Sequence, residues 1–273
     1  MSEVVGVLAG QPPLPERTLR RAREAGFRTV VAGFAGSVSR ETERLADCFR
    51  RFPLGQAEAV LRYFQEHGVT RVLMVGRIGH RSIFTLTGHD PTFRALWQTL
   101  PARTTTTLLS AVTDLFARHG VEVLDSTMFL QDWLAREGNY TPEVPVSADL
   151  ARDIEFGWQK AWGIARLDIG QTVCVRGGAV VAAEAMEGTD PAIRRAARLA
   201  RGGLVMVKVS RPGREMRFDV PVVGPRTIRL LARRHAAALV VEADRTLLID
   251  PPQVIELARR AKLALWGKKC ESV

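Results

Sequence analysis

Carboxylates, amides and hydroxyls gather in one stretch of the sequence, residues 167–190. Two runs of β-forming residues divide this stretch, and its polar side chains lie before the first run and after the second: Asp168, Gln171, Glu184, Glu187, Thr189 and Asp190. Since a hairpin brings its two ends together, we expect these groups to converge at one end. Carboxylate oxygens suit a hard ion such as Mg²⁺, and the free N–H groups of a helix start attract phosphate.

The elements that must position these groups can be predicted locally. Residues 171–176 and 179–185 are β-rich, and Gly177-Gly178 between them predicts a two-residue turn. Asp190-Pro191 predicts a helix start, with Asp190 as the N-cap and Pro191 at the first helical position. Gly188 precedes that helix.

Two charged residues follow in later predicted strands. Lys208 lies near the end of the strand 204–209, and Asp219 lies inside the strand 217–223. Aspartate is disfavoured in strands, so Asp219 is expected to have a partner. The alternative is that the Asp219 side chain lies on the exposed face of the strand. Carboxylates, a lysine and helix-start donors suit hydrolysis or transfer at phosphate, assisted by a metal ion.

The first half of the chain alternates between strand and helix patterns, which favours a parallel α/β sheet of the Rossmann type. The predicted elements are strand 4–9, helix 16–25, strand 28–32, helix 55–67, strand 71–75, helix 108–119 and strand 121–124. Gly10 and Arg77 come after two of these strands, where such sheets bind ligands. Arg77 could contact a phosphate; the alternative is that it is a solvated loop arginine without a ligand. The threonines 104–107 are expected to cap the following helix.

Turn-forming residues and prolines in 137–146 predict a linker between a domain of residues 1–136 and a domain of residues 147–273. In the second domain we expect Ser147 to cap a helix over 148–164. Gly224 and Thr227 open a basic helix that runs to about residue 235. Residues 239–242 and 247–250 are expected to form a last hairpin, and a final helix runs from Pro251 to near Trp266. This pattern predicts a mixed α/β domain.

Composition limits the classes of protein. The 273 residues carry 46% hydrophobic side chains, enough for sizeable cores, and no run could span a bilayer. The first residues lack a signal-peptide pattern, and three distant cysteines favour reduced thiols, so we expect a soluble cytoplasmic protein.

The net charge of +10 favours polyanionic partners: nucleic acid, phosphorylated ligands or an anionic membrane. A compositional bias toward arginine is the alternative. Since the basic residues are spread along the chain and no nucleic-acid-binding motif accompanies them, we expect no nucleic-acid partner.

Three motifs resemble the C-terminal domain of the LpxI family, whose members are UDP-2,3-diacylglucosamine pyrophosphatases of lipid A synthesis. They are LDIGQ at 167–171, EGTD at 187–190 and RFDVPVVG at 217–224. The N-terminal half is similar in layout, including VLMVGRI at 72–78, so the resemblance covers nearly the whole chain.

The resemblance implies two domains with the active site between them. It implies Mg²⁺-dependent hydrolysis of UDP-2,3-diacylglucosamine to UMP and 2,3-diacylglucosamine 1-phosphate (lipid X). The family's essential aspartate falls on Asp219, as a metal ligand or as the activator of the attacking water. The expected partners are this lipid-linked UDP-sugar and the inner membrane surface, which a basic protein would contact peripherally. A homodimer is permitted by the sequence but not demanded.

The candidate site residues form three sets. The catalytic residue is Asp219. The metal ligands are Asp219, Glu187 and Asp190. The substrate-binding residues are Gly10, Arg77, Gln171, Gly188, Thr189, Lys208, Gly224 and Thr227.

Two departures from the family pattern leave an alternative open. The family's first turn has the form AGGGxLP, whereas residues 9–15 read AGQPPLP, and Pro12 removes a backbone donor. The family tends to have paired aspartates where this chain has Thr105 and Thr106. The alternative function is therefore a catalytically altered or silent binder of a related lipid-linked or sugar nucleotide.

Overall fold

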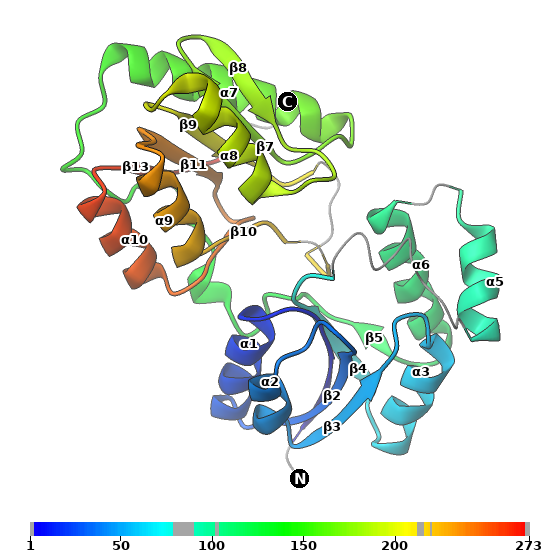
Figure 1. The fold of residues 1–273 in the computed structure, drawn as a ribbon. Helices are drawn as coiled ribbons and strands as arrows, with labels where there is room; N and C mark the ends of the chain where they lie inside the picture. Colours follow the sequence, from blue (N-terminus) through cyan, green and yellow to red (C-terminus); the bar gives the residue numbers. More distant parts are fainter. Residues whose placement is uncertain (1–2, 79–89, 102–103, 212–215, 219, 271–273) are drawn as a thin grey trace. The chain divides into compact units, whose positions relative to one another are not determined.

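The chain folds into two compact α/β units in a computed structural model that describes residues 3–78, 90–101, 104–211, 216–218 and 220–270. The N-terminal unit comprises residues 1–130 and 215–219, and the C-terminal unit comprises residues 131–214 and 220–273. Figure 1 shows the elements of each unit. The predicted fold class, two α/β domains, is confirmed.

The N-terminal unit is built on a parallel five-stranded sheet in the order β3-β2-β1-β4-β5. Its strands are β1 (Val4–Ala9), β2 (Arg28–Phe34), β3 (Cys48–Phe52), β4 (Arg71–Val75) and β5 (Glu122–Val123). Strands β1 and β2 are continuous buried runs, as expected where helices cover both faces of a parallel sheet. The strand order reverses between β1 and β4, which is the topological switch point of such a sheet.

Helices flank this sheet (Figure 1). They are α1 (Leu14–Glu24), α2 (Arg40–Leu45), α3 (Ala57–Glu66), α5 (Pro91–Thr99) and α6 (Thr105–Arg118). The threonine run caps α6 as predicted: the Thr104 hydroxyl accepts from the Thr107 amide, and the Thr107 hydroxyl accepts from the Thr104 amide.

The C-terminal unit has a six-stranded mixed sheet in the order β6-β13-β11-β9-β7-β8. Its strands are β6 (Gly138–Asn139), β7 (Thr172–Arg176), β8 (Ala179–Ala183), β9 (Val205–Lys208), β11 (Ala238–Glu242) and β13 (Ala264–Lys268). The central three, β9, β11 and β13, run parallel, and β6, β7 and β8 are antiparallel to their neighbours. Strand β6 lies within the segment 137–146.

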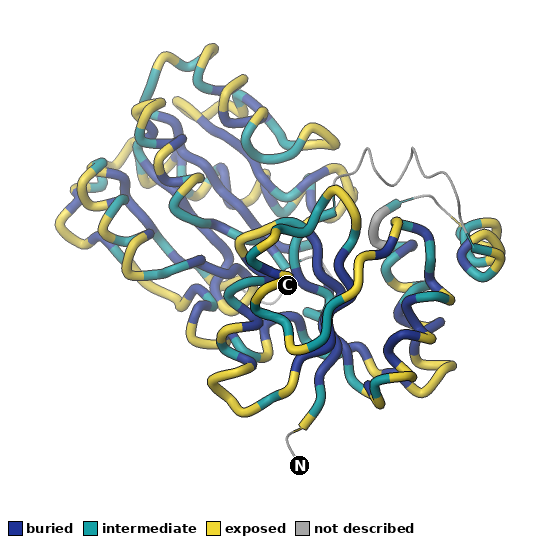
Figure 2. The backbone as a smooth tube through the Cα atoms, turned by 60° about the horizontal axis from the view of Figure 1, so that its bottom comes forward, coloured by how far each residue is buried: buried dark blue, intermediate teal, exposed yellow. Residues whose placement is uncertain are grey.

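Two helical layers enclose this sheet. Helix α7 (Ala148–Arg166), capped by Ser147 as predicted, packs on one face, where Trp158 lies in a cluster with Val173, Val207 and Val240. The other face packs against α8 (Thr189–Ala200), α9 (Pro225–Arg233) and α10 (Pro251–Arg260) through a second cluster. Figure 2 shows the strands as buried segments beneath more exposed helices.

The predicted hairpin joins β7 to β8. Gly177 and Gly178 have φ of 58° and 73°, as a turn with two left-handed residues requires. The buried carboxylate of Asp153, on α7, accepts from the amides of Gly177 at 2.7 Å and Gly178 at 2.6 Å. Helix α7 therefore holds the turn in place.

Two predictions about the last third of the chain are wrong. Strand β11 does not form a hairpin with β12 (Leu247–Leu248): β11 pairs with β9 and β13, and β12 pairs in parallel with β10 (Val222–Val223). The final helix ends at Arg260 and not near Trp266, because the apolar residues of β13 extend the buried sheet. Periodicity does not say which distant strand a buried run will pair with.

The predicted strand over 217–223 is also wrong for the described residues, since Met216–Phe218 form a turn and only Val222–Val223 are in a strand. The Ser126 amide donates to the Met216 carbonyl at 2.9 Å, which ties this turn to the N-terminal unit. Asp219 itself lies outside the described residues.

Candidate functional site

Polar residues of the C-terminal unit gather at one edge of its sheet, where β9 and β11 end. Antiparallel pairing places Thr172, at the start of β7, opposite Lys208, at the end of β9. Glu184 directly follows β8, and its amide donates to the Thr172 carbonyl at 2.8 Å. The carboxyl edge of parallel strands is where α/β sheets bind their ligands, so this edge is the candidate site.

Lys208 is the centre of this cluster and is only 6% exposed. Its Nζ lies 3.2 Å from the Thr172 hydroxyl, 3.0 Å from the Thr189 hydroxyl and 3.7 Å from Glu184 Oε2. The Thr189 hydroxyl donates to Glu184 Oε1 at 2.8 Å. Two hydroxyls and one carboxylate thus fix the position of the ammonium group.

The protonation of Glu184 follows from these contacts. Burial by itself raises the pKa of a carboxyl group, but the charge of Lys208 and hydrogen bonds from Thr172, Thr189 and Lys208 outweigh it. The net effect lowers the pKa of Glu184, so this carboxylate and Lys208 are an ion pair at neutral pH.

The loop before β7 passes close to Glu184. A Cβ atom on Gly170 would lie 1.8 Å from the Glu184 carbonyl oxygen, so only glycine permits this approach. The Gln171 carbonyl accepts from the Val209 amide at 2.9 Å, and the Gln171 side chain is half-buried. The predicted residues Gln171, Thr189 and Lys208 therefore lie at the same edge of the sheet.

Helix α8 begins differently from the prediction. Its N-cap is Gly188, with φ of 86°, and its first residue is Thr189, so Asp190 is not the N-cap. Glycine enters the left-handed region without strain, which lets the chain turn into the helix before Asp190. The Asp190 carboxylate instead contacts arginines: Oδ2 lies 2.8 Å from Arg226 Nη2 and 3.8 Å from Arg194 Nη2.

The Asp190–Arg226 ion pair links the starts of two helices, because Arg226 lies in the first turn of α9. Gly224 is the N-cap of α9, and its carbonyl accepts from the Thr227 amide at 2.9 Å. Among the described side chains, none caps either helix start. The first amides of a helix lack intrahelical acceptors, so both starts can offer donors to an anion.

A second buried cluster supports the chain just after Lys208. The amide and the hydroxyl of Ser210 both donate to Glu242 Oε2, each at 2.6 Å. Glu242 ends β11 and is buried, and burial raises its pKa although the hydrogen bonds from Ser210 and the charge of Arg245 oppose that effect. The next residue, Arg211, pairs with Asp168 at 2.5 Å.

Sequence reasoning missed Thr172, Ser210, Arg226 and Glu242 as parts of this site. Glu242 ends an apolar run, and the sequence predicts only a structural role for it. Its burial would have marked it as unusual, but burial depends on the fold. The partners of Asp190 and Glu242 lie far along the chain, so local spacing could not identify them.

The predicted metal ligands are engaged otherwise. Glu187 Oε1 lies 3.0 Å from Arg195 Nη2, and Asp190 is bound by Arg226. Within the described ranges, no three His, Cys, Asp or Glu side chains come together as a metal site would require. The described residues alone do not fit a magnesium site, and the third predicted ligand, Asp219, is outside them.

The two predicted residues of the N-terminal unit lie together at its switch point. The Gly10 amide donates to the Val75 carbonyl at 2.9 Å, and the Gln11 amide donates to the Arg77 carbonyl at 2.8 Å. A Cβ atom on Gly10 would lie 2.7 Å from the Arg77 carbonyl oxygen, so glycine is required here. The Arg77 side chain is exposed at the carboxyl end of β4.

Ser126 holds the segment that leads to Asp219. The Ser126 hydroxyl is buried, 2.6 Å from the Arg217 carbonyl and 2.8 Å from the Met74 carbonyl at β4. Its amide binds Met216. The backbone two residues before Asp219 is thus anchored to the N-terminal unit.

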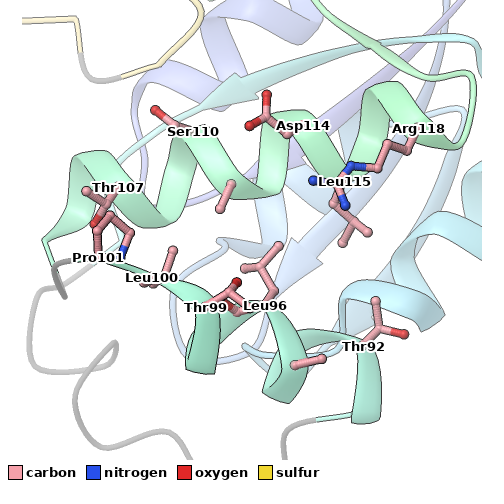
Figure 3. Close-up of a pocket in the computed structure, with 12 residues that line it drawn as sticks. Thr92, Leu96, Thr99, Leu100, Pro101, Thr107, Ser110, Asp114, Leu115 and Arg118 are labelled. Carbon is pink, nitrogen blue, oxygen red and sulfur yellow. The ribbon is translucent and has the colours of Figure 1, made fainter.

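A groove of about 700 Å³ lies between α5 and α6 (Figure 3). Leu96, Leu100, Ala111 and Leu115 supply much of its apolar lining, with Asp114 and Arg118 at its side. This volume is within the range of small-molecule sites. None of the predicted site residues that the structure describes lines it.

These features define a two-domain α/β protein whose polar residues lie at the carboxyl edges of parallel strands, the arrangement in which such folds bind phosphorylated ligands. The chain belongs to the LpxI family: the LpxI N-terminal domain matches residues 4–133, and the LpxI C-terminal domain matches residues 136–266.

A curated relative is UDP-2,3-diacylglucosamine pyrophosphatase LpxI of Caulobacter vibrioides, 29% identical over 278 residues that cover 96% of each chain. A solved structure, the biotin carboxylase domain of Hydrogenobacter thermophilus 2-oxoglutarate carboxylase, matches 72% of this chain and 41% of its own at 11% identity. Its TM-score of 0.25 supports no conclusion about a shared fold or function. Among the described helices, none is both long and apolar enough to cross a bilayer.

Proposed function

We propose that this chain is a hydrolase that cleaves the pyrophosphate bond of UDP-2,3-diacylglucosamine to give UMP and 2,3-diacylglucosamine 1-phosphate (lipid X). The observation that carries the proposal is that both LpxI domain models match, together spanning most of the chain. The named activity of the Caulobacter relative supports the same reaction. The Lys208 cluster supports it chemically.

Lys208 would act on the phosphates of the substrate. Its ammonium group is held by Thr172 and Thr189 before any ligand arrives. A preorganised cation stabilises negative charge that develops on phosphate oxygens, because it needs no rearrangement during the reaction. The amides at the starts of α8 and α9 would add uncharged donors, with Gly188, Gly224 and Thr227 at those starts. Gln171, next to Thr172 at the same edge of the sheet, is a further proposed substrate-binding residue.

Gly10 and Arg77, of the N-terminal unit, are also proposed substrate-binding residues. The exposed Arg77 side chain suits a phosphate oxygen. Gly10 lets the backbone after β1 pass close to the Arg77 carbonyl. Asp219 is the proposed catalytic residue, either as the activator of water or as a metal ligand.

Magnesium dependence is part of the proposal through the resemblance. Mg²⁺ in such enzymes usually takes one or two carboxylates together with substrate phosphates. Asp219 is the first ligand to test, because Glu187 and Asp190 are paired with arginines. Dialysis against EDTA should abolish turnover, and added Mg²⁺ should restore it; unchanged turnover after EDTA would remove the metal from the proposal.

The test of the activity is an incubation of the purified protein with UDP-2,3-diacylglucosamine and Mg²⁺, followed by separation of the products. The wild type should release UMP, and Asp219→Ala should release none while keeping its thermal unfolding midpoint. Asp149→Ala, at an exposed position on α7, is the matched control. Activity that persists in Asp219→Ala would remove Asp219 from the mechanism.

A silent binder is the second candidate function. It is favoured by Pro12 in the first turn and by threonines in place of the family's paired aspartates at the start of α6. It predicts a ligand-dependent rise in the unfolding temperature with no UMP released. Release of UMP by the wild type decides against it.

The cellular setting follows from the substrate. A lipid-linked UDP-sugar would be met by a cytoplasmic protein at the inner membrane, and the proposal includes peripheral contact there. Nucleic acid is not a proposed partner, and a homodimer is not required by this reaction.

A further inference from the structure

Two stripes of arginine lie on neighbouring helices of the C-terminal unit. Arg194, Arg198 and Arg201 recur at i, i+4 and i+7 along α8 and its C-cap. Arg226, Arg229 and Arg233 recur at i, i+3 and i+7 along α9. Such spacings place each set on one side of its helix.

All six of these arginines are exposed. Helices α8 and α9 pack beside one another on the same face of the sheet, away from α7 (Figure 1). We call these six residues the arginine face.

This charge is barely compensated on its own helices. Asp190 is the one acidic residue of α8, α9 has none, and Asp190 serves both Arg226 and Arg194. The helix on the opposite face of the sheet, α7, is different: its charges balance as Asp149, Asp153 and Glu155 against Arg152, Lys160 and Arg166. Of these three helices, α8 and α9 therefore carry net positive charge, and α7, on the opposite face of the sheet, does not.

An apolar residue borders the arginine face. Leu199, on α8 next to Arg198, is 67% exposed. At an anionic bilayer, arginine binds lipid phosphates and a neighbouring apolar side chain contacts the interface.

We propose that the arginine face docks the protein on an anionic lipid bilayer. Each basic residue near such a surface adds to the affinity, so six arginines with one shared carboxylate form a substantial docking surface. The choice of a bilayer over other polyanions rests on the proposed function, because the proposed substrate carries two acyl chains and resides in a membrane.

The arginine face also borders the candidate site. The Asp190–Arg226 ion pair joins the N-terminal ends of α8 and α9, and Thr189, beside Asp190, binds Lys208. A bilayer bound along these helices would thus lie beside the edge of the sheet where Lys208 is held. Docking and access of a lipid-borne phosphate to the site would be geometrically coupled.

The test is flotation of the purified full chain with vesicles of phosphatidylcholine alone or mixed with phosphatidylglycerol. The wild type should float only with the anionic vesicles, and added salt should release it. The triple variant Arg198→Gln/Arg229→Gln/Arg233→Gln should bind about 100-fold more weakly. The matched control, Arg152→Gln/Lys160→Gln/Arg166→Gln on α7, removes the same charge from the opposite face and should bind like the wild type.

Three outcomes would overturn the proposal. The first is that the wild type does not float with anionic vesicles. The second is that the two triple variants lose affinity equally, which would make net charge the cause. The third is that a labelled oligonucleotide outcompetes the vesicles at the same salt, which would favour nucleic acid.

Release of UMP from substrate in detergent micelles separates docking from catalysis. The arginine-face variant should keep the wild-type rate there. If no protein releases UMP in micelles, the proposed function fails while the flotation result still decides whether the face binds lipid.

Discussion

Lys208 and Glu184 form an ion pair whose side chains are 7% and 13% exposed. A pair so far removed from water depends on further hydrogen bonds. Thr172 and Thr189 supply them to Lys208 Nζ and Thr189 to Glu184 Oε1, whereas Glu184 Oε2 has no hydrogen-bond partner among the described residues. At the residue scale, the site is therefore a preformed charge arrangement.

Replacing Lys208 with methionine should leave Glu184 buried without its cation. We expect the free energy of unfolding to fall by about 3 kcal/mol at neutral pH, as measured by urea unfolding. In the wild type the pKa of Glu184 is lowered, so its stabilisation is present above the usual 4.5 and is lost as pH falls through the lower folded value. The variant should lose this acid dependence.

The double variant Lys208→Met/Glu184→Gln is the control for this prediction, since it removes both charges and should recover part of the lost stability. Equal destabilisation in the single and double variants would show that packing, and not charge, accounts for the effect.

Glu242 should give the opposite pH dependence. Burial raises its pKa, so the folded state binds the proton more tightly than the unfolded state does. Its contribution to stability is greatest below the usual 4.5 and declines as pH rises through the raised folded value. Relative to Glu242→Gln, the wild type should therefore lose stability with rising pH in that window.

Urea unfolding at several values from about pH 4 to 7 measures this difference. Glu256→Gln, on the outer side of α10, is the control and should show no such change relative to the wild type. A constant difference between the wild type and Glu242→Gln across the range would contradict the prediction.

At the scale of elements, one buried aspartate joins a helix to a hairpin. Asp153 on α7 accepts both amides of the Gly177-Gly178 turn. The hairpin in turn sets where β7 begins and β8 ends, and so where Thr172 and Glu184 meet Lys208. The turn is thus part of the support of the site although it lies at the other end of the strands.

Asp153→Ala should remove both acceptors at once. Because two turn amides lose the buried carboxylate that accepts from both, we expect a loss of about 2–3 kcal/mol in the free energy of unfolding and faster hydrogen exchange at Gly177 and Gly178. Ser147→Ala, which removes only the N-cap of the same helix, should cost about 1 kcal/mol and leave exchange at the turn unchanged. Protected turn amides in Asp153→Ala would contradict this assignment.

At the scale of the whole molecule, the chain returns to its first unit after it has built much of the second. Residues 215–219 group with the N-terminal unit, and Ser126 binds the Arg217 carbonyl 91 residues further along the chain. The segment that precedes Asp219 is therefore placed by a residue of the N-terminal half.

Ser126→Ala should loosen that segment without touching the substrate. If Asp219 is catalytic, we expect kcat for UMP release to fall about 10- to 100-fold, because small displacements of a reacting group are costly. KM should change little. Ser126→Thr keeps the hydroxyl and should recover most of the rate. A wild-type kcat in Ser126→Ala would show that this anchor does not position Asp219.

Family, fold class and many local elements follow from the sequence alone. The LDIGQ and EGTD motifs, the glycine turn of the hairpin and the caps Thr104 and Ser147 are all local features, and the structure and the family match agree with them. They are readable because a turn or a cap depends on residues a few positions apart.

Only the tertiary structure decided which distant residues meet. In the structure, β12 pairs with β10 instead of β11, and residues 264–268 form a strand. Asp190 forms an ion pair with Arg226, and Ser210 donates hydrogen bonds to Glu242. Strand partners and buried ion pairs are selected by packing among residues far apart in sequence, and periodicity carries no information about that selection.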